Sequence, residues 1–420
     1  MKVCVIGNGG REHALAWRLS ISPSVTKVYA IPGSAAMSDC TELVGIDWQQ
    51  SDHLIRFLKD NHVDLVVVGP EAPLVAGLAD ALNAAGIPVF GPSKAAAQLE
   101  GSKVFAKDLM KKYNIPTAAY GVFHKVDEAK EFIGQTGAPI VVKADGLAAG
   151  KGVVVAMTVE EANAAVEDML SGNRFGDAGS TVVIEEFMEG EEASLLAFVD
   201  GKTVVPMIAS QDHKRIFDGD KGPNTGGMGT YAPAPVLTDT LRDETMKTIL
   251  EPMVAAMQKE GMPYVGCLYA GLMITPQGPK VVEFNARFGD PETQVVLPLL
   301  DSDLGQIMMT CATGALTADM VKWKDSSAAC VILASKGYPE TSSKGDVIHG
   351  DIKQHDTTIV FHSGTKLVGD EYVTNGGRVL GVVGLGKDLR TALDRAYGRI
   401  EHINFEGMQY RTDIGAKAFK

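Results

Sequence analysis

The sequence predicts a mixed α/β protein with an N-terminal doubly wound domain, a small α+β module and a C-terminal α/β domain. Three observations support this fold class. Apolar strands alternate with helices over the first hundred residues, which is typical of a parallel sheet covered on both faces. Hairpin-like strands then flank a glycine-rich loop, and strand signals begin again near residue 326. We find no internal repeat.

The N-terminal part alternates buried strands with helices. The expected strands are Lys2–Ile6, Lys27–Ile31, Asp64–Val68 and Ile87–Phe90, and the expected helices are Glu12–Ser20, Ser51–Asn61 and Leu74–Ala85. Doubly wound sheets bind their ligands at the carboxyl ends of the strands. A long helical stretch, rich in Lys and Ala, is expected from Ser93 to Tyr113.

The rest of the chain contains shorter strands and longer loops. We predict strands at Ile140–Ala144, Val153–Met157, Thr181–Glu186, Ala193–Val199, Tyr264–Ile274, Lys280–Phe288 and Ala328–Ala334, and helices at Glu160–Leu170, Thr238–Glu260 and Asp388–Ile403. The Gly- and Pro-rich segment Gln211–Pro235 is expected to be a long loop. The turn Asn375-Gly376-Gly377 predicts a hairpin between Glu371–Thr374 and Arg378–Val383.

Composition excludes several classes of partner. The chain has 420 residues and a formal net charge of −13, which disfavours nucleic acid and anionic membranes because long-range attraction would be absent. No targeting or membrane segment is expected, since prolines and glycines interrupt the longest uncharged stretch, Gly261–Pro279. The 5 cysteines have no metal-ligand spacing and predict buried free thiols in a reducing cytoplasm.

Glycine is in excess, with 46 residues, and it gathers in short clusters. The first cluster, Gly7-Asn8-Gly9-Gly10-Arg11-Glu12-His13, lies between the first strand and the first helix, where backbone N–H groups can meet a phosphate. The alternative is a tight turn without a ligand. A dehydrogenase is disfavoured, because Glu12 stands where the third glycine should be and no ribose-binding acid follows the second strand.

The second cluster extends from Lys143 to Gly152 and includes Gly146, Gly150 and Lys151. It is not a P-loop, because its glycine spacing is short by one residue and a strand follows it. A flexible glycine hairpin with two lysines suits nucleotide phosphates that are covered after binding. An ordinary hairpin with solvated lysines is the alternative.

The third element extends from Lys280 to Glu292. On a strand, Glu283, Asn285 and Arg287 share one face. Carboxylate and amide oxygens suit Mg²⁺, and an arginine beside them can neutralise a phosphoryl group. A half-solvated amphipathic strand is the alternative, although the Gly-Asp-Pro-Glu turn adds two more acids there. A further strand ends in the acidic patch from Glu185 to Glu192, and its edge could bind an adenine and a ribose.

Together these blocks resemble the ATP-grasp superfamily and, within it, the glycinamide ribonucleotide synthetase family. The resemblance rests on the blocks above and on Gln211-Asp212-His213-Lys214-Arg215 and Asn224-Thr225-Gly226-Gly227-Met228-Gly229, in order along essentially the whole chain. It implies an ATP-grasp fold with an N-terminal domain at 1–102, an ATP-grasp region at 103–325 and a C-terminal domain at 326–420. Within that region it implies a lid at about 123–190 and a central part at 191–325.

The resemblance also implies a reaction. ATP, glycine and 5-phosphoribosylamine would give glycinamide ribonucleotide, ADP and phosphate through a glycyl phosphate, in purine biosynthesis. Mg²⁺ or Mn²⁺ would be the metal, and we expect a cytoplasmic monomer with no nucleic-acid or membrane partner.

The family pattern assigns a role to each block. Arg287 and Lys214 would be catalytic, and Glu283 and Asn285 would bind the metal. ATP would contact Lys103, Lys143, Gly146, Gly150, Lys151, Gly152, Glu185, Glu186, Phe187, Met188 and Glu192. The other substrates would contact Gly9, Gly10, Arg11, Asp212, Asp290, Pro291 and Glu292. The alternatives are another ATP-grasp ligase, for instance a biotin-carboxylase-like or purine-carboxylating enzyme, and a nucleotide-sensing module without chemistry.

Overall fold

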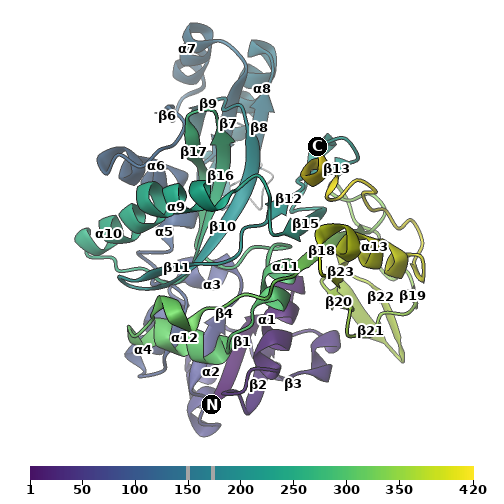
Figure 1. Cartoon of the computed structure of the whole chain (residues 1–420). Coiled ribbons are helices and arrows are strands. Elements are labelled where there is room, and N and C mark those ends of the chain that lie inside the picture. Colours follow the sequence, from purple (N-terminus) through teal and green to yellow (C-terminus); the bar gives the residue numbers. More distant parts are fainter. Residues whose placement is uncertain (148–151, 172–175) are drawn as a thin grey trace.

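The N-terminal domain is a parallel sheet of five strands in the order β3-β2-β1-β4-β5. The computed structural model describes residues 1–147, 152–171 and 176–420 of the chain (Figure 1). The strands of this sheet are β1 (Lys2–Gly7), β2 (Lys27–Pro32), β3 (Glu42–Leu43), β4 (Leu65–Val68) and β5 (Val89–Phe90). The helices are α1 (Gly10–Ser20), η1 (Ala35–Asp39), α2 (Ser51–Asp60), α3 (Glu71–Ala76), α4 (Leu78–Ala84), α5 (Gln98–Gly101) and α6 (Lys103–Lys112). The predicted doubly wound domain is confirmed, and its strand order reverses between β1 and β4.

Two predicted helices are each divided in two. The stretch Leu74–Ala85 is interrupted at Gly77, whose φ of +96° ends α3 in a left-handed conformation. The stretch from Ser93 to Tyr113 is interrupted at Ser102, which is extended. The Ser102 hydroxyl accepts a hydrogen bond from the Phe105 N–H and so caps α6. This break places the first residues of α6 next to the glycine-rich loop.

A small four-stranded antiparallel sheet in the order β6-β9-β7-β8 has its own hydrophobic core and lies at one end of the molecule (Figure 1). Its strands are β6 (Tyr120–Phe123), β7 (Ile140–Ala144), β8 (Val153–Ala156) and β9 (Val182–Glu186), and its helices are α7 (Val126–Thr136), α8 (Val159–Ser171) and η2 (Gly176–Gly179). The predicted hairpin around the glycine loop is confirmed, because β7 pairs with β8.

The central sheet has the order β11-β10-β16-β17 and is antiparallel. Its strands are β10 (Glu191–Asp200), β11 (Val204–Pro206), β16 (Val265–Thr275) and β17 (Gly278–Asn285). The nearby helices are α9 (Asp239–Thr245), η3 (Met246–Leu250), α10 (Glu251–Lys259), α11 (Thr293–Val296), η4 (Leu297–Leu299), α12 (Leu304–Thr313) and η5 (Ala318–Met320). The last predicted strand is shorter than expected, since β17 ends at Asn285 and Arg287 lies beyond it.

The segment Gln211–Pro235 is not the long loop that its composition indicates. It holds β12 (Gln211–Asp212), β13 (Arg215–Phe217), β14 (Lys221–Asn224) and β15 (Gly229–Ala232). Strand β15 is fully buried and pairs with β18 (Ser327–Ala334) of the C-terminal sheet, whose order is β12-β15-β18-β23-β20. The prediction failed because β15 pairs with a strand nearly a hundred residues away, which no local pattern shows, while β12 pairs with β15 and β13 pairs with β14 within the segment.

The C-terminal part completes that sheet and adds one long helix. Its other elements are β19 (His349–Gly350), β20 (Thr358–His362), β21 (Thr365–Val368), β22 (Glu371–Thr374), β23 (Arg378–Gly386), α13 (Leu389–Ile400), β24 (Ile403–Asn404) and η6 (Ala416–Phe419). The predicted hairpin between β22 and β23 is wrong. Strand β22 pairs with β21, whereas the largely buried β23 lies between β18 and β20.

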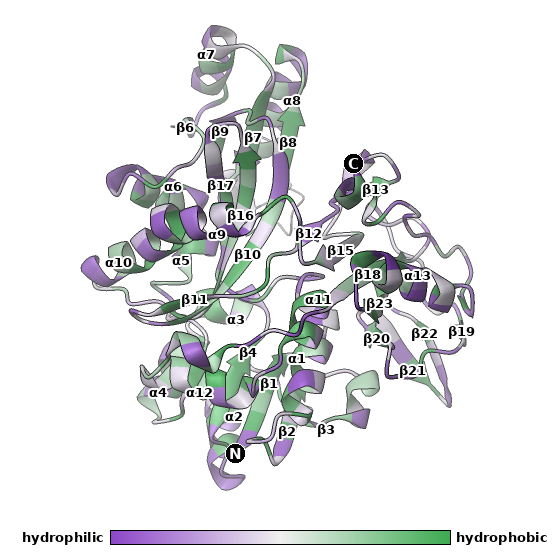
Figure 2. Ribbon diagram, in the orientation of Figure 1, coloured by the Kyte–Doolittle hydropathy of each residue, from purple (hydrophilic) through white to green (hydrophobic). Residues whose placement is uncertain are grey.

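Hydrophobic residues follow the strands of the sheets, and hydrophilic residues lie on the outer faces of helices such as α10 (Figure 2).

The cysteines are free, and all but Cys40 are buried. Burial raises the pKa of the Cys40 thiol to about 12 and those of the other cysteines further. Within the described residues, no helix has the length and hydrophobicity needed to cross a membrane.

The contact between β23 and α13 gives a prediction for stability. A Cβ at Gly384 would collide with the carbonyl oxygen of Ala392, which is backbone and cannot rotate away. Gly384→Ala should therefore lower the free energy of unfolding by about 3 kcal/mol. Gly398 lies on α13, and a Cβ added there would meet no atom within 4 Å. Gly398→Ala should therefore be neutral or slightly stabilising. Calorimetric unfolding of both variants checks this, and equal melting temperatures would contradict it.

Candidate active site

The first glycine-rich turn closes around the carboxylate of Glu12. The Gly9 N–H donates to Glu12 Oε2 at 2.7 Å, and Arg11 Nε lies 2.5 Å from Glu12 Oε1. A Cβ at Gly7 or Gly69 would collide with the Glu12 side chain. The glycines of this turn therefore have a packing role, which the sequence did not indicate. The phosphate-binding role of Gly9 and Gly10 stays a prediction.

Asp290 reaches the start of α1 from the other side of the turn. Its Oδ2 accepts from the Arg11 N–H at 3.3 Å, and its Oδ1 accepts from Gln294 Nε2 at 2.8 Å. Arg378, at the start of β23, donates to the Asp290 carbonyl at 2.8 Å. Burial would raise the pKa of Asp290, but Arg378 and Arg11 outweigh it and hold the pKa below its ordinary value. A negative charge thus already faces the positive end of helix α1.

Pro291 and Glu292 follow Asp290 at the same edge of the site. A Cβ at Gly227 would press against the Pro291 ring, so the Gly226-Gly227 segment approaches it closely. Glu292 is 2% exposed and accepts from the Tyr269 hydroxyl at 2.5 Å. Burial and the charge of Asp212 raise the pKa of Glu292. Tyr269 was not predicted from the sequence, because nothing local to its strand distinguishes it from a core tyrosine.

Asp212 and Lys214 form an ion pair of 2.8 Å opposite Glu292. Burial would lower the pKa of Lys214, but Asp212, Tyr269 and Glu292 together hold the pKa above its ordinary value, so this lysine stays charged. The pair opens on a small cavity beside Glu283. The cavity is lined by Glu192, Ala193, Ser194, Asp212, Lys214, Tyr269, Gly271, Leu272, Val282 and Glu283.

Two lysines contact a buried carboxylate at the base of the glycine-rich loop, and a third lysine bonds the loop itself. Glu185 Oε2 lies 3.0 Å from Lys143 Nζ and 3.3 Å from Lys107 Nζ. Lys103 Nζ donates to the Gly146 carbonyl at 2.9 Å. Burial is the main cause that lowers the pKa of Lys107, to about 8. Lys107 was missed, although its position one helical turn after Lys103 on α6 was a signal that could have found it.

The other predicted ATP-binding residues lie around this group. Glu186 is exposed, and its N–H donates to the Ala119 carbonyl at 2.8 Å. Phe187 and Met188 follow β9 and are half-buried, and Glu192 lies on the exposed start of β10. Gly152 accepts from the Ala144 N–H through its carbonyl at 2.8 Å. Gly150 and Lys151 lie outside the residues that the structure describes.

Glu283 and Asn285 lie together at the end of β17. Asn285 Nδ2 lies 3.4 Å from Glu283 Oε1. Burial would raise the pKa of Glu283, but Lys214, Lys143 and Lys103 hold it below its ordinary value, so the carboxylate is charged. No group of three or more His, Cys, Asp and Glu side chains suited to a metal occurs in the described part of the chain. These two oxygen donors fit a hard cation that takes its remaining ligands from a nucleotide.

Arg287 is held by two carboxylates from the N-terminal domain. Its Nη2 donates to Glu100 Oε1 at 2.7 Å, and its Nε donates to Glu71 Oε2 at 3.2 Å. Nη2 also lies 3.3 Å from Asn285 Oδ1. Neither acid was predicted, because Glu71 and Glu100 precede Arg287 by 216 and 187 residues and belong to helices with no motif of their own.

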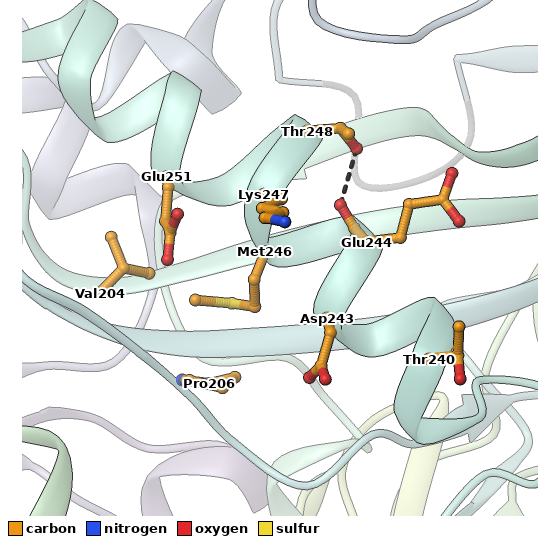
Figure 3. Close-up of a pocket in the computed structure, with 9 residues that line it drawn as sticks. All are labelled: Val204, Pro206, Thr240, Asp243, Glu244, Met246, Lys247, Thr248 and Glu251. Atoms are coloured by element: carbon orange, nitrogen blue, oxygen red, sulfur yellow. Dashed lines mark hydrogen bonds between the residues drawn. The ribbon is translucent and has the colours of Figure 1, made fainter.

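A larger hollow lies at the edge of the central sheet, between strand β11 and the helical segment from α9 to the start of α10 (Figure 3). It is lined by Val204, Pro206, Thr240, Asp243, Glu244, Met246, Lys247, Thr248 and Glu251, and the Thr248 hydroxyl donates to the Glu244 carbonyl at 2.8 Å. None of the predicted site residues lines it. Its side chains include three carboxylates and one lysine, without a buried polar group aimed at a ligand.

Comparisons with known proteins agree with this arrangement. Three family profiles match the chain in order: the N domain of phosphoribosylglycinamide synthetase at residues 1–100, its ATP-grasp (A) domain at 101–293 and its C domain at 328–417. The chain belongs to the phosphoribosylglycinamide synthetase family. It is therefore an ATP-grasp ligase, and the ATP-grasp fold expected from the sequence is confirmed. The alternative function, a nucleotide-sensing module without catalytic activity, is therefore not supported.

Relatives in this family match over their full length. The chain is 53% identical to a phosphoribosylamine–glycine ligase of Neisseria meningitidis and 52% identical to one of Escherichia coli O157:H7, covering 100% of this chain and 99% of each relative. A crystal structure of a phosphoribosylamine–glycine ligase from Thermotoga maritima superposes with a TM-score of 0.86 at 34% identity, over 99% of this chain and 100% of that one.

The fold extends beyond the family. The biotin carboxylase domain of a 2-oxoglutarate carboxylase from Hydrogenobacter thermophilus, solved with MgADP, ADP and bicarbonate, has a TM-score of 0.75 at 16% identity. The match covers 97% of this chain and 91% of that one. At this identity the likeness shows a shared fold and nothing about the substrate.

Proposed function

We propose that the chain joins glycine to 5-phosphoribosylamine with consumption of ATP, and that the product is glycinamide ribonucleotide. The observation that carries this proposal is the convergence of five cationic side chains with the Glu283 and Asn285 oxygens at one edge of the central sheet. The five cationic side chains are Lys103, Lys107, Lys143, Lys214 and Arg287. Relatives that are about half identical over their whole length carry the matching name.

The chemistry that we propose has two steps. A glycine carboxylate oxygen takes the γ-phosphoryl group, which gives glycyl phosphate and ADP. The amine nitrogen of phosphoribosylamine then attacks the carbonyl carbon, the C–O bond to phosphate breaks, and the nitrogen gives up one proton, which the departing phosphate takes up. The carboxylate is a poor electrophile until phosphate makes its oxygen a leaving group. Positioning and charge neutralisation therefore supply most of the rate.

Each cluster of the site has a proposed role. Lys103 and Lys143 contact the nucleotide phosphates, together with the described glycines Gly146 and Gly152. Glu186 at the end of β9 and the following residues Phe187 and Met188 contact the adenine, and Glu192 contacts the ribose. Glu185 is buried between Lys143 and Lys107, so we assign it to holding these lysines rather than to the adenine.

The remaining residues act on the charges of the reaction. Glu283 and Asn285 would hold Mg²⁺ or Mn²⁺, and a cation bound there would offset the charge of the phosphates. Arg287 stabilises the transferring phosphoryl group. Lys214 keeps its charge beside Asp212 and orients the glycine carboxylate. We assign the sugar phosphate to Gly9, Gly10 and Arg11, and the amines to the acids Asp212, Asp290 and Glu292, with Pro291 shaping their turn.

Substrate dependence tests this function. ADP release should require glycine and 5-phosphoribosylamine together, because the carboxylate is the phosphoryl acceptor. ADP release is measured with each substrate omitted in turn. Turnover of similar rate without glycine would overturn the assignment and point to another ATP-grasp ligase, in which a different acid accepts the phosphoryl group.

A further inference from the structure

A chain of alternating charges joins the first glycine-rich turn to Arg287. It begins at the Gly9 N–H, which donates to Glu12, and continues through the Glu12–Arg11 pair. Arg11 Nη1 lies 3.9 Å from Glu71 Oε2. The same Glu71 oxygen accepts from Arg287 Nε at 3.2 Å. One carboxylate oxygen therefore faces both arginines.

These contacts lie in a sheltered part of the molecule. The side chain of Arg11 is 10% exposed, that of Arg287 16% and that of Glu71 30%. Burial would raise the pKa of Glu71, but Arg287 and Arg11 hold it below its ordinary value. Ion pairs with so little exposure are only weakly screened by salt. Both arginines also lie 3.3 Å from the Phe288 carbonyl oxygen, so the two guanidinium groups share two acceptors.

We propose that Glu71 is a positioning residue that couples the two substrate subsites by fixing where both guanidinium groups point. The inference rests on the proposed function, in which Arg11 faces the sugar phosphate and Arg287 faces the transferring phosphoryl group. Glu71 touches neither group. Its loss should therefore loosen two arginines at once, which a residue with a purely structural role at one subsite would not do.

Steady-state kinetics with Glu71→Gln tests this role. The variant keeps the shape of the side chain and removes its charge. We expect kcat to fall about tenfold and KM for 5-phosphoribosylamine to rise at least about threefold, with KM for ATP unchanged. Glu71→Asp should recover part of both effects, because it restores the charge. Glu42→Gln, which removes an exposed carboxylate from the same domain, should leave all constants unchanged.

A double-mutant cycle with Arg11→Lys isolates the coupling. If Glu71 acts through Arg11, the loss of kcat/KM in the double variant should be smaller than the product of the losses in the two single variants. We expect the difference to be a factor of about three or more. Losses in kcat/KM that simply multiply in the double variant would overturn the proposal. A Glu71→Gln variant that changes kcat alone, KM alone or neither constant would overturn it as well.

Binding of ribose 5-phosphate, measured by calorimetry, does not need turnover. We expect Glu71→Gln, or Glu71→Asp if the first variant does not fold, to bind this probe at least about threefold more weakly than the wild type. Unchanged binding would overturn the coupling. A wild-type protein without glycine-dependent ADP release would instead overturn the proposed function, and the calorimetric comparison would still decide the role of Glu71 toward Arg11.

Discussion

Glu283→Ala should abolish turnover, with a loss of about 1000-fold or more in kcat, while the protein stays folded. The reason is electrostatic. The Glu283 carboxylate opposes three lysines, and with Asn285 it forms the pair of oxygens to which we assign the cation. Without it, the site keeps its positive side chains but loses the charged oxygen donor that, with Asn285, would hold the metal.

The measurement is ADP release at saturating substrates, with circular dichroism and thermal unfolding as the check on folding. The matched control is Glu251→Ala, the same substitution in the larger hollow of Figure 3, where we expect normal activity. Near-normal turnover by Glu283→Ala would remove the metal assignment. Loss of activity in the control as well would indicate a general effect of charge.

Acidification below pH 6.5 should destabilise the protein strongly, because three histidines are buried in their neutral form. Burial is the main cause that lowers the pKa of His13 to about 3 and those of His213 and His362 to about 4. The ordinary value, 6.5, applies to the unfolded chain. Between about pH 4 and 6.5 the unfolded state therefore binds more protons, and the free energy of unfolding falls as the pH falls.

Each histidine contributes about 1.4 kcal/mol per pH unit in that window, so the three together contribute about 4 kcal/mol per unit. Urea unfolding at pH 7, 6 and 5 measures this slope. His13 Nδ1 accepts from the His362 N–H at 3.0 Å, and His13→Asn preserves an acceptor there while removing one titrating group. This variant should reduce the slope by about a third. The exposed His53→Gln should leave it unchanged, and a flat profile in the wild type would contradict the prediction.

The sequence was most informative where a pattern is local. The alternation of buried strands and helices predicted β1, α1, β2, α2 and β4, because period and length are properties of neighbouring residues. The same logic predicted the pairing of β7 with β8. It failed at Asn375-Gly376-Gly377, because none of these three residues adopts the positive φ that a primed hairpin turn requires. The Asn375 N–H donates to the Gly364 carbonyl at 2.7 Å, and this contact directs β22 toward β21.

In the candidate site too, the residues of a local pattern were predicted from the sequence and their distant partners were not. Glu283, Asn285 and Arg287 were found because the expected alternation puts them on one face of a strand. Strand β17 ends at Asn285, but the structure still brings the three side chains together. Glu71 and Glu100, which hold Arg287, come from the other end of the sequence. Such partners can be found only when the fold places them. Their roles, like those of the predicted residues, now depend on the experiments above.

The pairing of β15 with β18 has a consequence for how this protein can be divided. Asp212 and Lys214 precede β15 in the chain, yet β12 and β15 belong to the sheet that residues after 326 complete. A fragment cut near residue 326 would leave β15, which is fully buried in the intact chain, as an open strand edge prone to aggregation. A chimaera that exchanges the C-terminal part between relatives should therefore carry residues 209–235 with it, because this segment and the last hundred residues form one structural unit.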